Sequence, residues 1–284
     1  MKIDEILRKI HHLDKRIIDI SMIAIISFAL LVPMAIPVSI SPMTRKFYDT
    51  IGAVPDGSTV VIVFGLSMAG MYELGPFVAS MLNQLFAKKV HVVLTHIKYA
   101  ESPASLNVVF DKGWSRLPSD QTYGKDWVNL GFLAGDEIGL ASMAKNLRGS
   151  FGKDTRGTPI DQLPIMDKLV TWRDWDLTIY CGWDMTTVEA FIRQFFGARK
   201  LIYISISMVA YAMPYYPDQA AAILGGTKPA AEYELPLGHP GPGLKSTNVL
   251  SLSQILIVAF ILIGNLAYFA LKYRETSDKS EVEK

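Results

Sequence analysis

Two long apolar runs, one near each end of the chain, constrain its fold most. Residues 17–40 contain a single charged side chain, Asp19, and residues 250–271 contain none. As a helix rising about 1.5 Å per residue, each run is long enough to cross a hydrocarbon layer of about 30 Å. A buried core helix is rarely this long with so little charge. We therefore predict transmembrane helices over residues 17–40 and 249–272.

Basic residues outside these runs predict the orientation of the chain. Five lysine and arginine residues precede the first run and four follow the second, whereas only Arg45, Lys46 and Lys245 lie on the inner flanks. The positive-inside rule then places both termini in the cytoplasm and residues 43–248 on the other side of the membrane. Residues 273–284 would form a charged cytoplasmic tail.

The first sixteen residues have a pattern of their own. Apolar side chains recur there at helical spacing, with lysine, arginine and histidine between them: Ile3, Ile6, Leu7, Ile10 and Leu13. Residues 1–16 are therefore predicted to form an amphipathic helix that lies in the cytoplasmic membrane interface. The alternative is a simple helical extension of the first membrane helix.

The composition of the chain argues against several classes of function and of binding site. The chain has 284 residues and a formal net charge of only +1, so it lacks the basic signature of a nucleic-acid-binding protein. A single cysteine, Cys181, excludes an internal disulfide and a cysteine-based zinc cluster. No motif in the sequence implies a cofactor.

The middle of the chain alternates between strand-like and helical patterns. Apolar, β-branched runs predict strands at 58–65, 90–96, 126–135, 175–182 and 200–207. Helical patterns lie near 71–87, 136–147, 185–197 and 211–224. Continuous hydrophobicity is expected when helices cover both faces of a parallel sheet, and the alternation indicates right-handed βαβ crossovers. We predict a Rossmann-like three-layer α/β domain over residues 43–234, with a mostly parallel five-stranded sheet.

Two stretches interrupt this alternation, at residues 98–124 and 148–172. Loops of this length in a compact domain are usually functional or packed against a partner. Residues 235–248, rich in proline and glycine and without periodicity, are predicted to link the domain to the second membrane helix.

Ser67 follows the first strand between two glycines, Gly65 and Gly70. The spacing G-x-S-x-x-G differs by one residue from the nucleophile elbow of serine hydrolases, and no acid followed by a histidine is placed to activate the hydroxyl. The turn is also a weak phosphate site, because Glu73 in the first helical turn would repel an anion. The preferred interpretation is a strand-to-helix turn in which the glycines give backbone freedom.

Other polar residues follow the strands at the same edge of the predicted sheet. Ligands bind to open parallel sheets at the carboxyl ends of the strands, which makes Ser67, Asp136, Asp184 and Tyr211 a candidate ligand or metal site. Two carboxylates there could bind a divalent metal or perform acid–base chemistry. Aspartate in this position is, however, also the ordinary N-cap of the following helix, and that interpretation is preferred.

Several segments carry a resemblance to a known family. They are DKRII at 14–18, PDGSTVVIVF at 55–64, YGKDWVNLGF at 123–132, RGTPIDQLPIM at 156–166 and ILGGTKPAAEYE at 223–234. Their order resembles an uncharacterised prokaryotic family of two-span membrane proteins with a Rossmann-like middle domain, over nearly the whole chain. Because no activity is established for that family, the resemblance implies an architecture and no catalytic residue.

Asn265 lies inside the second apolar run, where an amide without a partner is costly. Gly264 and nearby alanines allow another helix to approach closely. We predict that this segment contacts a second copy of the chain; the alternative is the first membrane helix of the same chain.

Two functions fit these observations. The first is a non-enzymatic scaffold anchored in the lipid bilayer, whose α/β domains form a homo-oligomer at the membrane through residues 148–172, the tyrosine cluster at 211–217 and the second membrane helix. The second is a membrane-anchored enzyme or small-ligand receptor that uses the carboxyl edge of the sheet. Another membrane protein is a further partner left open. A single chain has too few polar residues in its apolar runs to line a pore.

Overall fold

The computed structural model consists of two compact units. Unit 1 combines Met1–Pro37 with Lys245–Lys284, and unit 2 is Val38–Leu244. The structure describes residues 2–32, 39–116, 119–197, 201–205, 220–238 and 241–282.

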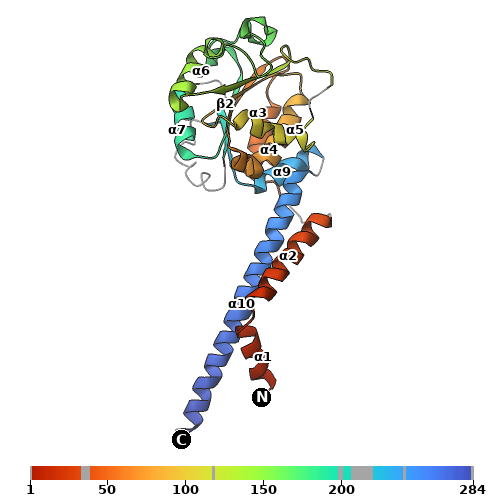
Figure 1. Cartoon of the computed structure of the whole chain (residues 1–284), viewed down its shortest axis with the longest axis vertical. Helices are drawn as coiled ribbons and strands as arrows, with labels where there is room; N and C mark the ends of the chain where they lie inside the picture. The colour runs from red at the N-terminus through yellow and green to blue at the C-terminus, as the bar shows by residue number, and fades with distance from the viewer. Residues whose placement is uncertain are drawn as a thin grey trace. The chain divides into compact units, whose positions relative to one another are not determined.

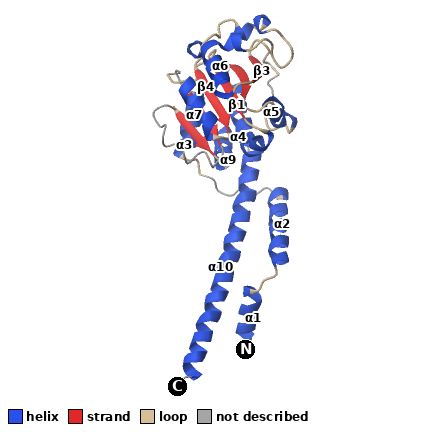
Figure 2. Cartoon of the chain, turned by 60° about the vertical axis from the view of Figure 1, so that its left-hand side comes forward, coloured by secondary structure: helices blue, strands red, loops and turns tan. Residues whose placement is uncertain are grey.

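Unit 2 is an α/β domain built on a parallel sheet (Figure 2). The strand order is β3-β2-β1-β4-β5-β6, which is the order of a Rossmann-like doubly wound fold. The strands are β1 Thr59–Gly65, β2 His91–Ile97, β3 Trp127–Leu133, β4 Leu177–Gly182, β5 Leu201–Ser205 and β6 Ala222–Gly225. The predicted Rossmann-like α/β fold with a parallel sheet is thus confirmed.

The predicted number of strands was wrong. Among the described residues the sheet has six strands, because residues 222–225, assigned to a helix over 211–224, pair in parallel with β5 as β6. This strand has only four residues, and short apolar runs do not distinguish a helix end from an edge strand. Residues 206–219, including Tyr211 and the rest of the tyrosine cluster, lie outside the described part of the chain.

Helices cover both faces of the sheet (Figure 1). One group comprises α3 Pro42–Gly52, α4 Met68–Phe86, α5 Ser102–Asp111 and α9 Lys228–Leu237. The other comprises α6 Asp136–Ser150 and α7 Met185–Gln194. With both faces covered, all residues of β4 and all but the first of β1 are buried, which explains their continuous hydrophobicity.

The long stretch 148–172 packs onto its own domain. It contains two short 3₁₀ turns, η1 Ile160–Gln162 and η2 Pro164–Met166, and leads into a third, η3 Trp172–Asp174. Four of its apolar side chains are buried in the core: Ile160, Leu163, Met166 and Leu169. The buried carboxylate of Asp154 organises the start of the loop by accepting hydrogen bonds from the backbone N–H groups of Arg156 and Thr158. The length of this loop therefore serves the fold of unit 2.

Two glutamates on α9 each bind the start of another helix. Glu232 accepts hydrogen bonds from the Ser41 N–H (3.0 Å) and the Thr44 hydroxyl (2.6 Å) at the start of α3. Glu234 accepts from the N–H groups of Gly241, Gly243 and Leu244, at 2.6–2.8 Å. These carboxylates satisfy N–H groups that have no partner within their own helices.

Those contacts explain an error in the prediction for residues 235–248. The segment was predicted to be a linker without periodicity, but α9 continues to Leu237 and α10 begins at Pro242. Proline suits the first turn of a helix, and Glu234 caps the N–H groups exposed there. Most of the described part of this segment is therefore helical.

All the secondary structure in the described part of unit 1 is helical. These are α1 Lys2–His11, α2 Lys15–Leu31 and the continuation of α10, which spans Pro242–Val282. Asp14 caps α2 by accepting from the Arg16 N–H, so α1 is a separate helix and not an extension of α2. Within the described chain, Pro242–Arg274 is the one helix long and apolar enough to cross a membrane, with a mean hydropathy of 2.3. The first predicted span, 17–40, is described only in part.

Candidate functional site

The carboxyl edge of the sheet collects the polar residues that follow its strands. Ser67 comes after β1, Lys98 after β2, Asp136 after β3 and Asp184 after β4. Parallel pairing places the ends of these four neighbouring strands at one edge. Three of the four predicted site residues are thus brought to this edge, while Tyr211 lies outside the described residues.

Ser67 is a helix cap. Its hydroxyl accepts a hydrogen bond from the Gly70 N–H at 3.2 Å, and the side chain is almost completely buried at the start of α4. No histidine hydrogen-bonds to it among the described residues, so nothing there activates it as a nucleophile. This geometry is consistent with the interpretation of the segment as a strand-to-helix turn and not as a nucleophile elbow.

The glycines around Ser67 lie close to neighbouring side chains, and at Gly65 an aromatic side chain leaves no room for a Cβ atom. Gly65 pairs with Gly182 on β4, and the Tyr180 side chain lies over both, so that a Cβ atom at either glycine would overlap its hydroxyl oxygen. At Gly70 a Cβ atom would lie 3.4 Å from the ring of Trp183. The G-x-S-x-x-G spacing therefore reflects close packing between β1, β4 and α4.

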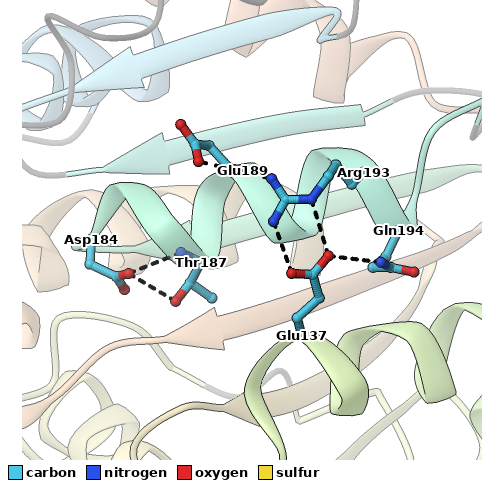
Figure 3. A network of polar contacts seen from close by, with 6 residues as sticks. All are labelled: Glu137, Asp184, Thr187, Glu189, Arg193 and Gln194. Carbon is cyan, nitrogen blue, oxygen red and sulfur yellow. Dashed lines mark hydrogen bonds and ion pairs between the residues drawn. The ribbon is translucent and has the colours of Figure 1, made fainter.

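Asp184 is also a cap, and it is ion-paired as well. Its Oδ1 accepts from the Thr187 N–H and the Thr187 hydroxyl, each at 2.9 Å, at the start of α7 (Figure 3). The same oxygen lies 3.1 Å from the Lys98 ammonium group. Asp184 is therefore fixed in place from two sides.

Lys98 lies close to both candidate carboxylates. Burial alone lowers its pKa, but the hydrogen bond and the charge of Asp184, with further charge from Asp136, outweigh this and raise the pKa overall. The ammonium group paired with Asp184 already neutralises one of the two carboxylates that a bridging metal would need. Within the described residues no cluster of three histidine, cysteine, aspartate or glutamate side chains is placed to hold a metal ion.

The backbone at this edge includes two unusual conformations. Lys98 has φ +67° and Asp136 has φ +44°, in the left-handed region that residues other than glycine rarely adopt. Asp136 is the first residue of α6, and the N-cap is Gly135, at φ +107°, so the interpretation of Asp136 as the N-cap was wrong. These conformations turn the chain sharply at the ends of β2 and β3.

His96 lies near the carboxyl end of β2, and the sequence predicted no role for it. It is completely buried on β2, stacks on Phe64 with ring centroids 5.3 Å apart, and hydrogen-bonds through Nδ1 to the Ser102 hydroxyl at 2.9 Å. Burial lowers its pKa to about 3, so the ring is neutral near pH 7. Its contacts place it in the core between β2 and α5, where it supports packing.

Glu137 joins the two helices on one face of the sheet. Its carboxylate binds the Arg193 guanidinium through two hydrogen bonds of 2.9 and 3.1 Å and also accepts from Gln194 at 2.9 Å (Figure 3). The hydrogen bond from Arg193 is the main reason that the pKa of Glu137 falls to about 2. The pair clamps the start of α6 to the end of α7.

Two aromatic residues complete the edge. Trp183 donates its indole N–H to the Tyr99 hydroxyl, which connects the ends of β4 and β2. Cys181, beside Trp183, is buried, and burial raises the pKa of its thiol. A protonated, inaccessible thiol is not a nucleophile.

The predicted contact residues of the second membrane helix lie on α10. Asn265 is exposed, and its side chain makes no hydrogen bond to any other described residue. No atom lies within 4 Å of a Cβ atom built at Gly264, so this face of α10 is open. The alternative contact, with the first membrane helix of the same chain, is not seen in the described part of unit 1.

The described polar side chains at the carboxyl edge act mainly as helix caps and ion-pair partners. Ser67 caps α4, and Asp184 caps α7 and pairs with Lys98. Glu137 joins α6 to α7, and His96 is buried in the core. At this edge, three buried polar atoms have no hydrogen-bond partner among the described residues: His96 Nε2, Tyr180 Oη and Asp184 Oδ2.

Comparisons with known proteins add no assignment. No protein-family model, no curated protein and no solved structure matches this chain.

Proposed function

We propose that this chain is a membrane-anchored, non-enzymatic α/β protein that assembles into a homo-oligomer. The observation that carries the proposal is the state of the carboxyl edge, where Ser67 and Asp184 serve as helix caps and Lys98 forms an ion pair with Asp184. An enzyme of this fold would need an activated group at that edge.

The membrane anchor is proposed to have two spans. The apolar helix Pro242–Arg274 supports the second, and α2 with the apolar residues after it supports the first. The basic flanks favour cytoplasmic termini, with the α/β domain on the opposite side.

Two features support assembly of several copies. Asn265 presents an amide on an exposed apolar helix, and a second copy would supply its hydrogen-bond partner. On unit 2, Ile138 and Phe196 are 81% and 68% exposed, next in sequence to the Glu137 clamp. Ile138 lies on α6 and Phe196 in the turn that follows α7, and exposed large apolar side chains of this kind suit a protein interface.

Disulfide cross-linking tests the proposed contact between spans. Because Cys181 is buried and is the only cysteine, a cysteine at position 265 would be the one reactive thiol. We expect Asn265→Cys to form disulfide-linked dimers in oxidised native membranes. The matched control Ile263→Cys, about 200° around the helix, should not. Equal cross-linking of both variants, or of neither, would argue against the contact.

A small-ligand receptor is the second candidate function. The unpartnered buried atoms of His96, Tyr180 and Asp184 favour it, because such atoms usually have a partner. A bound molecule should be released when the purified chain is denatured, and Asp184→Asn should lower its amount. Mass spectrometry that finds no released small molecule would contradict this function.

A further inference from the structure

Unit 1 contains a basic cavity between α1 and α10. The cavity has a volume of about 430 Å³, which is within the range of small-molecule sites. It is lined by Arg8, His11, His12, Tyr268, Leu271 and Lys272.

The lining is suited to an anion. Arg8 and Lys272 carry full positive charges, and each imidazole offers an N–H donor whether or not it is protonated. No carboxylate is among the described residues that line the cavity. Guanidinium and ammonium groups with additional N–H donors are the groups that proteins use to bind phosphate oxygens.

Aromatic contacts hold the cavity together. The His11 ring lies 5.6 Å from the Tyr268 ring, and the Lys272 ammonium group lies 6.0 Å from the centre of the same ring. His12 in turn packs edge-on against His11 at 4.9 Å. Tyr268 thus ties the end of α1 to α10 and also contacts the Lys272 ammonium group.

The position of the cavity along α10 identifies the source of the phosphate. The uncharged run of α10 ends at Leu271, and Lys272 is the next residue. Tyrosine at the end of a membrane helix lies at the level of the lipid headgroups, and a basic amphipathic helix such as α1 lies in the same layer. Basic pockets between helices at this depth bind the headgroups of anionic lipids.

We propose that this cavity binds the phosphate headgroup of an anionic phospholipid. Arg8 and Lys272 contact the phosphate oxygens, while His11 and His12 donate further hydrogen bonds. A zwitterionic headgroup binds less well, because its choline cation meets the same two positive charges. The inference rests on the proposed insertion of α10 into a membrane.

The test is competition between lipids for the full chain in mild detergent, read by native mass spectrometry. Phosphatidylglycerol and phosphatidylcholine with the same acyl chains are added in equal amounts, and the retained lipid is counted. We expect retention of phosphatidylglycerol, with the preference reduced about fivefold by Arg8→Gln or Lys272→Gln, and about 30-fold by both. Retained phosphatidylcholine in the same spectrum reports that each variant is folded.

Lys9→Gln is the matched control, since Lys9 is also a cation of α1 but pairs with Glu5 at 3.2 Å and does not line the cavity. Equal retention of both lipids by the wild type, or an equal effect of Lys9→Gln and Arg8→Gln, would overturn the proposal. Displacement of phosphatidylglycerol by millimolar inorganic phosphate would also overturn it, because the site would then serve soluble phosphate.

Carbonate extraction of membranes separates this proposal from the one on which it rests. A chain that stays in the membrane pellet but shows no lipid preference would contradict the headgroup site alone. A chain released into the supernatant would contradict both the membrane anchor and the site.

Discussion

The Tyr180 side chain determines which residues are allowed at the ends of β1 and β4. A Cβ atom at Gly65 would overlap mainly the Tyr180 hydroxyl oxygen, because the ring carbons of Tyr180 are 3.1 Å or more away. A Cβ atom at Gly182 would overlap both the hydroxyl oxygen and the ring. The hydroxyl itself is buried without a partner among the described residues.

This difference gives a double-mutant prediction. Gly65→Ala and Gly182→Ala should each lower the free energy of unfolding by about 1–3 kcal/mol, because overpacking strains the core. Adding Tyr180→Phe removes the overlapping oxygen and should recover most of the loss for Gly65→Ala but little for Gly182→Ala. Chemical denaturation of the four variants measures this, and equal recovery would contradict the packing described for Tyr180.

Ser67 gives a prediction that separates a cap from a nucleophile. Ser67→Ala should lower the free energy of unfolding by about 1 kcal/mol, the usual value of an N-cap hydrogen bond. Thr227→Ala is the control, because Thr227 precedes α9 without making a side-chain cap bond. Labelling of wild-type Ser67 by a fluorophosphonate probe would show that the hydroxyl is activated and that its role as a cap is incomplete.

At this scale the sequence predicted local roles better than long-range ones. The caps at Ser67 and Asp184 follow from residue type and from position after a strand. The ion pair between Lys98 and Asp184 joins positions 86 residues apart in the sequence, and no local pattern indicates it. No local pattern indicates the packing of Tyr180 over Gly65 either. This packing explains a glycine that the sequence analysis attributed only to backbone freedom.

The clamp between α6 and α7 makes the stability of the domain depend on pH. The pKa of Glu137 falls from its ordinary value of 4.5 to about 2 in the folded protein. A depressed carboxyl pKa contributes stability that is complete above pH 4.5 and is lost as the pH falls toward 2.

We therefore expect Glu137→Gln to be less stable than the wild type near pH 7, with the difference disappearing between pH 4.5 and about 2. The measurement is thermal unfolding of both proteins across this range. Glu189→Gln is the control, since its carboxylate lies 3.9 Å from Arg193 and makes the weaker contact with it. A difference between Glu137→Gln and the wild type that stays constant with pH would contradict the clamp.

Strands with long, continuous apolar runs were predicted well, and the exceptions have physical reasons. The β1, β2, β3 and β4 strands are buried on both faces and read as continuous apolar runs. β6 has four residues, too few to show a period. The start of α10 depends on Glu234, whose hydrogen bonds to Gly241, Gly243 and Leu244 come from the neighbouring helix and have no signature in the segment itself.

For the molecule as a whole, the proposed orientation across a membrane rests on charge alone. Nine lysine and arginine residues outside the apolar runs, against three on the inner flanks, predict that residues 43–248 face away from the cytoplasm. Protease added to intact spheroplasts should therefore digest the α/β domain. Digestion only after lysis would reverse the orientation.

Assembly is the central claim, and the native mass of the full chain in mild detergent tests it most directly. The account predicts a homo-oligomer at micromolar concentration. Asn265→Leu should weaken it slightly, because an interhelical hydrogen bond in a membrane is worth about 0.6–2 kcal/mol. Gln254→Leu, an amide nearer the end of the same apolar run, should leave it unchanged. A monomer of 31.5 kDa for the wild type would contradict the account.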